Sequence, residues 1–156
     1  MNAPTQSLPD AWPDRPGQLY RVLKKLLGIG LSRVELPEGL TLNVPLPKYL
    51  LQEFHNLPNG NYSHGVTVAY STGFDRAMLG EMNLARAEMA RALAGCDEVL
   101  DVGCGAGGST AAIKAAGAKR VVGLDASPYM LEHARRRSPE LDFVQGLAED
   151  TRLDAG

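Results

Sequence analysis

The residues with the clearest chemistry are a cluster of glycines that follows a short apolar segment. Residues 99–102 are apolar except for one acid, and glycine then occupies positions 103, 105, 107 and 108. Such a run, bounded by glycine, is typical of a buried strand. Glycine lacks the Cβ that keeps a ligand off the backbone and adopts φ > 0 in tight turns. Residues 109–116 favour a helix, so a ligand in this bend would face free helix N–H groups.

A second candidate binding residue ends the next apolar segment, residues 120–125. Asp125 follows the first glycine at close to the spacing of about 20 residues expected of an acid that binds ribose hydroxyls. Two strands joined by a helix predict a right-handed βαβ unit. Ser127 and Pro128 predict the start of another helix, because serine caps helices and proline suits the first turn. Residues 142–145 predict a third strand.

These segments resemble the motifs of the class I S-adenosylmethionine (SAM) dependent methyltransferases. Residues 101–107 look like the first motif, acid-x-Gly-x-Gly-x-Gly, residues 124–130 like the second, and residues 144–150 like the third. The resemblance implies an α/β, Rossmann-like methyltransferase fold, incomplete in this chain, with about three parallel strands and their crossover helices. It assigns residues 81–156 to the N-terminal half of a SAM-binding domain and implies SAM as the cofactor.

The resemblance also implies roles at the methionine end of SAM. Gly103, Gly105 and Gly107 would pass close to the methionine part of the cofactor. Asp101 would lie near its amino group. No metal ligands are implied, and no catalytic residue can be assigned, because methyl transfer needs a base only when the acceptor must lose a proton.

At the adenosine end, the resemblance places Asp125 on the ribose hydroxyls and Ala126 against the adenine. The Ala148 N–H and the Glu149 side chain would face the adenine edge. Leu147 departs from the pattern, since many family members carry Asp there, so the ribose contact is the better supported of the two.

Two alternatives stay open from the residues alone. Gly103, Gly105 and Gly108 also satisfy the GxGxxG dinucleotide pattern, which would indicate a fragment of an NAD(P)-binding oxidoreductase. Asp101 favours SAM, because a negative charge beside the bend suits a cationic amino group and sits poorly beside a pyrophosphate. The other alternative is a non-catalytic SAM-binding or interaction module.

Composition narrows the classes of partner. The 156 residues carry a net charge of −2, with 44% hydrophobic and 22% charged residues, so there is no basic field for nucleic acid. No apolar run approaches a membrane span of about 18 residues. The two cysteines, Cys96 and Cys104, form no metal-ligand pattern, and no signal peptide is evident, which predicts a cytoplasmic protein. Cys104 is interpreted as a small apolar filler.

The part of the chain before the motifs is expected to be mostly helical. Residues 1–17 are rich in proline and predict a flexible arm, and residues 18–80 predict a helical region with a β-hairpin. The expected elements are helices over 18–27, 48–55 and 66–79 and a hairpin over 34–46. A clear helix over 81–94 leads into the first strand.

The methyl acceptor is expected to be a small molecule. Aromatic residues before position 81 are compatible with a partly apolar pocket; they are Phe54, Tyr62, Tyr70 and Phe74. His64 lies in a polar stretch, residues 59–65, where it is either a solvated structural residue or a general base.

The end of the chain shapes the expected activity. The fold that the chain resembles has seven strands, whereas this chain stops at Gly156, after the third. We therefore expect a truncated or split methyltransferase that is inactive alone. The outer edge of the first strand would pair with a partner chain or with the missing C-terminal half.

Overall fold

The core of the protein is a parallel sheet of three strands. The computed structural model describes residues 8, 9, 27, 34, 36–52, 62–151 and 153. Within them the strands are β1 (Glu98–Val102), β2 (Arg120–Asp125) and β3 (Asp142–Gln145), in the order β1-β2-β3. The central strand β2 is buried along residues 121–124, whereas β1 alternates between exposed and half-buried residues. The predicted α/β architecture with parallel strands is confirmed.

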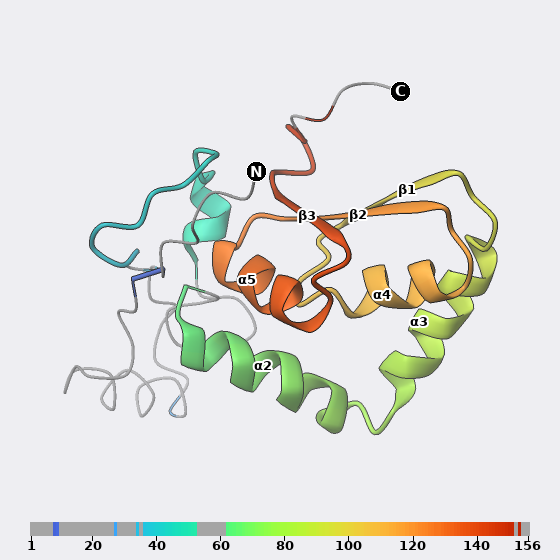
Figure 1. Ribbon diagram of the computed structural model, residues 1–156. Helices are drawn as coiled ribbons and strands as arrows, with labels where there is room; N and C mark the ends of the chain where they lie inside the picture. The colour runs from blue at the N-terminus through green and yellow to red at the C-terminus, as the bar shows by residue number, and fades with distance from the viewer. Residues whose placement is uncertain are drawn as a thin grey trace.

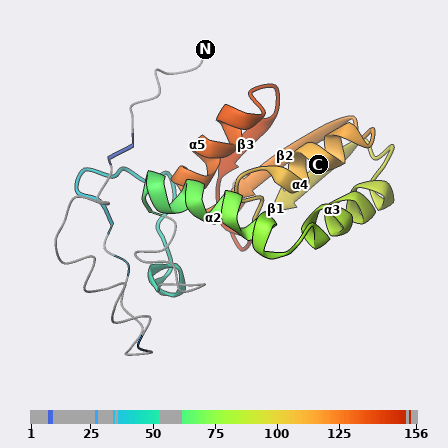
Figure 2. The same cartoon turned by 90° about the horizontal axis from the view of Figure 1, so that it is seen from below.

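Two long helices precede the sheet and two connect its strands, in the order that the sequence predicts. They are α2 (His64–Ala77), α3 (Glu81–Ala92), α4 (Gly108–Ala115) and α5 (Pro128–Arg137), and η1 (Lys48–Leu51) is a single 3₁₀ turn. Figure 1 shows α4 and α5 next to the strands and α2 on the far side of these helices. In the turned view of Figure 2, α2 runs across from α5 towards α3. The described helices therefore cover one face of the sheet.

The start of α5 follows from its first residues. The Ser127 hydroxyl accepts a hydrogen bond from the Met130 N–H at 3.3 Å, and Pro128 occupies the first turn. The buried side of this helix carries Tyr129, Leu131 and Ala134. The cap thus sets where the helix begins. Leu131 and Ala134 pack on the sheet, whereas Tyr129 packs against Val34 and Tyr62.

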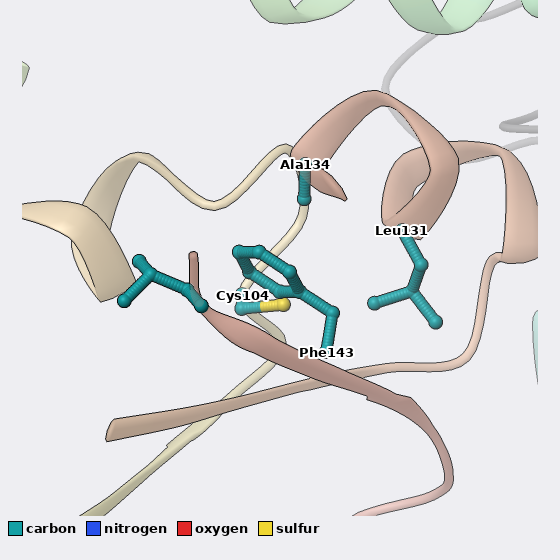
Figure 3. Packing of buried hydrophobic residues seen from close by; sticks show 5 residues of the cluster. Cys104, Leu131, Ala134 and Phe143 are labelled. Carbon is teal, nitrogen blue, oxygen red and sulfur yellow. The ribbon is translucent and has the colours of Figure 1, made fainter. Parts of the chain in front are cut away.

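Two apolar clusters fasten the helices to the sheet. The first contains Cys104, Leu131, Ala134, Leu141 and Phe143. Figure 3 shows the Phe143 ring rising from β3 beneath Ala134, with the Cys104 side chain beside it. The second joins α3 and α4 to the start of β2 and consists of Ala90, Ile113, Ala118 and Val121. Together these clusters hold the bend between β1 and α4 against α5.

The β-hairpin predicted over residues 34–46 is wrong. The expected turn does form, since the Leu40 N–H donates to the Pro37 carbonyl at 3.2 Å and Gly39 has φ +80°. No strand follows it in the described part of this segment. The Val34 N–H donates instead to the Leu51 carbonyl at 2.9 Å, so its backbone pairs with η1 rather than with a second hairpin strand.

The other expectations before α3 have mixed outcomes. The helix predicted over 48–55 is reduced to η1, and residues 53–60 lie outside the described residues. So do residues 18–26 of the first predicted helix and most of the predicted arm. The helix predicted over 66–79 begins two residues earlier, because Ser63 caps it by accepting from the Val66 N–H at 3.2 Å.

Candidate cofactor site

The glycine bend between β1 and α4 is tied to the end of β2. The N–H groups of Gly103 and Cys104 donate to the Leu124 carbonyl at 2.7 and 3.0 Å. Gly103 and Gly105 have φ angles of +75° and +53°, in a backbone region that residues with a side chain rarely adopt. A Cβ built on either glycine meets no atom within 4 Å. The backbone at both positions therefore borders open space that a ligand can occupy.

Gly107 is a glycine for a different reason. A Cβ there would lie 2.9 Å from Phe143 Cζ and 3.1 Å from the Ala134 Cβ. Gly123, which the sequence did not single out, has the same neighbour, with a built Cβ 2.6 Å from Phe143 Cδ1 and 2.9 Å from the Cys104 sulfur. Both glycines make room for the core of Figure 3. A contact of Gly107 with cofactor stays a prediction.

Asp125 joins the bend to the next turn. Its Oδ2 accepts from the Gly105 N–H at 2.9 Å, and its Oδ1 accepts from the Ser127 N–H at 2.8 Å. Burial raises the pKa of this carboxyl, and the two N–H groups partly offset that effect. Each carboxylate oxygen can accept a second hydrogen bond. Asp125 therefore connects the bend to the following turn and can still accept hydrogen bonds from ribose hydroxyls.

Asp101 is held at the first turn of α4. Its Oδ2 accepts from the Ser109 and Thr110 hydroxyls at 2.6 and 2.7 Å. The hydroxyls fix the carboxylate at the end of β1, beside the open bend. Its Oδ1 accepts no hydrogen bond within the part of the chain that the structure describes, so a ligand amino group can use it.

The third predicted segment forms a tight turn at the end of β3. Leu147 and Asp150 exchange backbone hydrogen bonds of 3.2 and 3.1 Å, which leaves Ala148 and Glu149 exposed at the tip. Glu149 Oε1 accepts from the Tyr49 hydroxyl at 2.8 Å, and this bond raises the pKa of that hydroxyl. The N-terminal segment thus reaches the predicted adenine side.

A second link from the N-terminal segment was missed by the sequence reasoning. The buried Gln145 side chain accepts from the Asn43 N–H at 3.1 Å and donates to the Ala126 carbonyl at 3.0 Å. Gln145 lies beside Asp125 in the sheet register. The sequence did offer a signal for Gln145, because it is the last residue of a predicted strand that neighbours the strand ending in Asp125. Asn43 and Tyr49 lie about 100 positions from their partners, and the sequence offered no signal for their contacts.

A cavity of about 320 Å³ opens beside the glycine bend. Helices α2, α3 and α5 supply its apolar wall, which consists of Tyr70, Phe74, Met82, Met89 and Met130. Its charged side chains are Asp75, Arg86 and Arg137. Asp75 and Arg86 form a two-pronged ion pair with N–O distances of 2.7 and 3.0 Å, and its hydrogen bonds lower the pKa of the Asp75 carboxyl.

Of the other residues considered from the sequence, His64 and Tyr62 lie away from this cavity. His64 begins α2, with Nε2 3.2 Å from the Leu8 carbonyl oxygen and Nδ1 3.5 Å from a Glu132 oxygen. Tyr62 packs edge-on against Tyr129 in a separate cluster. Of the four aromatics, Tyr70 and Phe74 line the cavity, and Phe54 lies outside the described residues. His64 is therefore not placed to act at the bend.

Comparison with known proteins assigns the C-terminal segment. A family model described as a methyltransferase domain matches residues 99–156. This segment belongs to a class I SAM-dependent methyltransferase domain. An uncharacterized methyltransferase from Synechocystis sp. is 48% identical over 59 residues, which are 38% of this chain and 27% of that relative. The predicted family is confirmed for residues 99–156.

The methyltransferase domain is represented here only in part. A trans-aconitate 2-methyltransferase from Paracidovorax citrulli is 47% identical over 55 residues, 34% of this chain and 21% of that protein. The matched segments thus span about a quarter of the relatives' lengths.

Solved methyltransferase structures give partial overlaps. DesVI from Streptomyces venezuelae has 28% identity and a TM-score of 0.42 over 49% of this chain and 35% of its own. CalS10, an amino pentose methyltransferase from Micromonospora echinaspora, has 31% identity and a TM-score of 0.38 over 49% and 31%.

Proposed function

We propose that the chain binds SAM at the glycine bend and takes part in methyl transfer to a small-molecule acceptor. One observation carries this: the Gly105 N–H bonds to the Asp125 carboxylate at 2.9 Å. The first and second methyltransferase motifs thus meet beside open backbone. The family match over residues 99–156 supports SAM over a nicotinamide cofactor.

Each end of the cofactor has residues that fit it. The backbone at Gly103 and Gly105 and the free oxygen of Asp101 suit the methionine part with its amino group. Asp125 would accept from the ribose hydroxyls, and Ala126 with the Ala148 N–H and Glu149 would border the adenine. The open space at the two glycines and the unused acceptor positions of both acids support this fit.

The chain's own contribution to catalysis would be alignment and exclusion of water. Bound SAM supplies a methyl group already activated on a sulfonium. The cavity beside the bend, walled by Tyr70 and Phe74, is the space that we assign to the acceptor. Holding the two reactants in line accounts for a large part of such a barrier. We assign no general base.

The exposed edge of β1 supports a second proposal about partners. Leu100 and Val102 are 40% and 49% exposed on the face away from α4. Within the described residues, β1 pairs on one side only, with β2. We propose that a further strand, from this protein or another chain, adds to this edge. Its addition would extend the three-stranded sheet beyond β1, and SAM binding without turnover even then would favour a non-catalytic module.

The two free cysteine thiols support the cytoplasmic location that we propose. Cys96 and Cys104 are both free, as expected of a reducing compartment. In addition, none of the helices among the described residues has the length and apolarity needed to cross a bilayer.

Calorimetric titration of the full chain tests the cofactor proposal. We expect SAM and S-adenosylhomocysteine to bind and NAD not to bind. Gly105→Val should weaken both adenosyl ligands by at least about 100-fold, or about 2.8 kcal/mol, because the side chain fills the open space. Gly95→Val is the matched control, since Gly95 also has positive φ and open surroundings but lies before β1. Binding of NAD alone, or equal binding by both variants, would overturn the proposal.

A further inference from the structure

Three consecutive arginines end α5, and the structure gives each a different environment. Arg135 donates to the Phe143 carbonyl at 2.7 Å. Arg136 pairs with Glu132 one turn earlier. Arg137 lines the cavity beside the glycine bend and makes no hydrogen bond or ion pair with any residue that the structure describes. Its exposed guanidinium interacts with the Asp75 carboxylate only at longer range, where it helps to lower the Asp75 pKa, so of the three it is the one without a direct partner.

A second cation is held at the opposite side of the same cavity. Arg86 lies against the first turn of α4, where a Cβ on Gly108 would come within 3.1 Å of its Nε. A helix N-terminus carries a partial positive charge, so a guanidinium there is electrostatically unfavourable. Asp75 compensates Arg86 through their ion pair. Arg137 also contributes to the lowered pKa of Asp75, so this one acid serves two guanidinium groups. One net positive charge and the positive end of α4 remain.

The balance of charge indicates a single negative group. Asp75 is the one acid among the described residues that line the cavity, against Arg86 and Arg137. Asp101 lies nearby, but its Oδ2 is already used by two hydroxyls. One net cation beside a helix N-terminus suits a monoanion, while Asp75 would repel a dianion such as phosphate.

The rest of the wall indicates what carries that group. The Tyr70 and Phe74 rings lie 5.4 Å apart, and Met82, Met89 and Met130 complete an apolar lining. Gly103 and Gly105 also line the cavity, so it is continuous with the bend. An anionic group on an apolar body, reaching the bend, fits these surroundings.

We propose that this cavity binds a ligand carboxylate, with Arg137 as its ion-pair partner. The inference rests on the proposed function for the ligand's identity. The carboxylate belongs to an acceptor acid with an apolar body. Arg137 then determines specificity for the acid, while the Asp75–Arg86 pair keeps the site from being more strongly positive.

The test compares Arg137→Gln with Arg136→Gln, its neighbour outside the cavity. Three probes are titrated into the full chain: 5′-methylthioadenosine, which lacks the amino-acid end, S-adenosylhomocysteine, and phenylacetate added to chain saturated with S-adenosylhomocysteine. Phenylacetamide is the neutral match for phenylacetate. Loss of one charged hydrogen-bond partner predicts about 10- to 100-fold weaker carboxylate binding in Arg137→Gln.

The pattern of losses identifies the source of the carboxylate. A loss for phenylacetate but not for phenylacetamide supports an acceptor carboxylate. A loss for S-adenosylhomocysteine but not for 5′-methylthioadenosine would assign the carboxylate to the cofactor and overturn the proposal. Arg136→Gln should change neither. Thermal unfolding of both variants at the same temperature as the parent shows that the effect is local.

Failure of the inference and failure of the proposed function look different. Adenosyl ligands and phenylacetate that bind Arg137→Gln and the parent equally well would overturn the carboxylate site and leave the cofactor proposal standing. An equal loss of binding in Arg136→Gln would overturn the carboxylate site as well. If the parent binds no adenosyl ligand, the cofactor proposal fails, and phenylacetate titrated into the chain alone decides the carboxylate site by the same pair of variants.

Discussion

The glycines around the bend divide into two groups that the sequence alone does not distinguish. Gly103 and Gly105 border open space, whereas Gly107 and Gly123 border the Phe143 ring. The first pair leaves backbone accessible to a ligand. The second pair lets the bend and β2 approach β3 and α5. The same residue type therefore leaves open space on one side of the bend, where we propose that the cofactor binds, and permits close packing on the other. Substitutions should separate the two.

The largest expected effect is on folding, from Gly123→Val. The added side chain would meet Phe143 and the Cys104 sulfur inside the buried cluster. Overpacking of this kind costs about 1 to 3 kcal/mol, and we expect the upper end because both neighbours are enclosed. Urea denaturation measures it. The double variant Gly123→Ala with Phe143→Leu should lose less stability than Gly123→Val. A urea midpoint for Gly123→Val equal to that of the parent would contradict the packing role.

Asp125→Ala should act chiefly on binding. Removing the carboxylate takes away the charged acceptor for ribose hydroxyls, which should weaken S-adenosylhomocysteine binding by about 1.5 to 3 kcal/mol in calorimetry. The exposed Asp142, on β3, provides the control Asp142→Ala. Equal affinities for the two variants, both shown to be folded by circular dichroism, would place the cofactor elsewhere.

Ser127→Ala should have a smaller effect, on stability. The hydroxyl caps α5 by accepting from the Met130 N–H, and loss of such a cap costs about 1 kcal/mol. Ser71→Ala, at a half-buried position within α2 where the hydroxyl donates to the Val68 carbonyl of the same helix, should stay within about 0.5 kcal/mol of the parent in the same denaturation experiment. A cost for Ser71→Ala as large as that for Ser127→Ala would show that the cap is not the cause.

The smallest expected effect is a dependence of stability on pH. Burial raises the pKa of Asp125 in the folded chain, so folding favours its protonated form. That stabilisation is complete below the ordinary Asp pKa of about 4 and is lost as pH rises through the raised value. Asp75, whose pKa is lowered by Arg86, works in the opposite sense and loses its contribution as pH falls.

Comparing the parent with Asp125→Asn isolates the Asp125 contribution. The parent should lose stability relative to the variant as pH rises above about 4. Urea denaturation at a series of pH values measures the difference. A difference that is constant with pH would show that burial does not shift this carboxyl.

The predictability of the fold differs between the two halves of the chain. The bounds predicted for β2 and β3 agree with the structure, and α4 and α5 begin within a residue of their predicted starts. Each has a local cause, such as the Ser127 cap or the glycine before α4. Residues 34–46 have no such self-contained structure, because Leu40 and Leu46 pack against the cluster of Tyr62 and Tyr129 rather than against a partner strand.

By itself the sequence determined the order of strands and helices, the open glycine bend and the pairing of that bend with an acid about 20 residues on, because these depend on local backbone preferences and short spacings. Only the tertiary structure decided which glycines serve packing and that Arg137, alone of the three consecutive arginines, lines the cavity. It also decided that Asn43 and Tyr49 bind Gln145 and Glu149, which connects the N-terminal segment to the predicted adenosine side. The physical reason is that these contacts join residues distant in the chain, whose meeting depends on how the helices pack on the sheet.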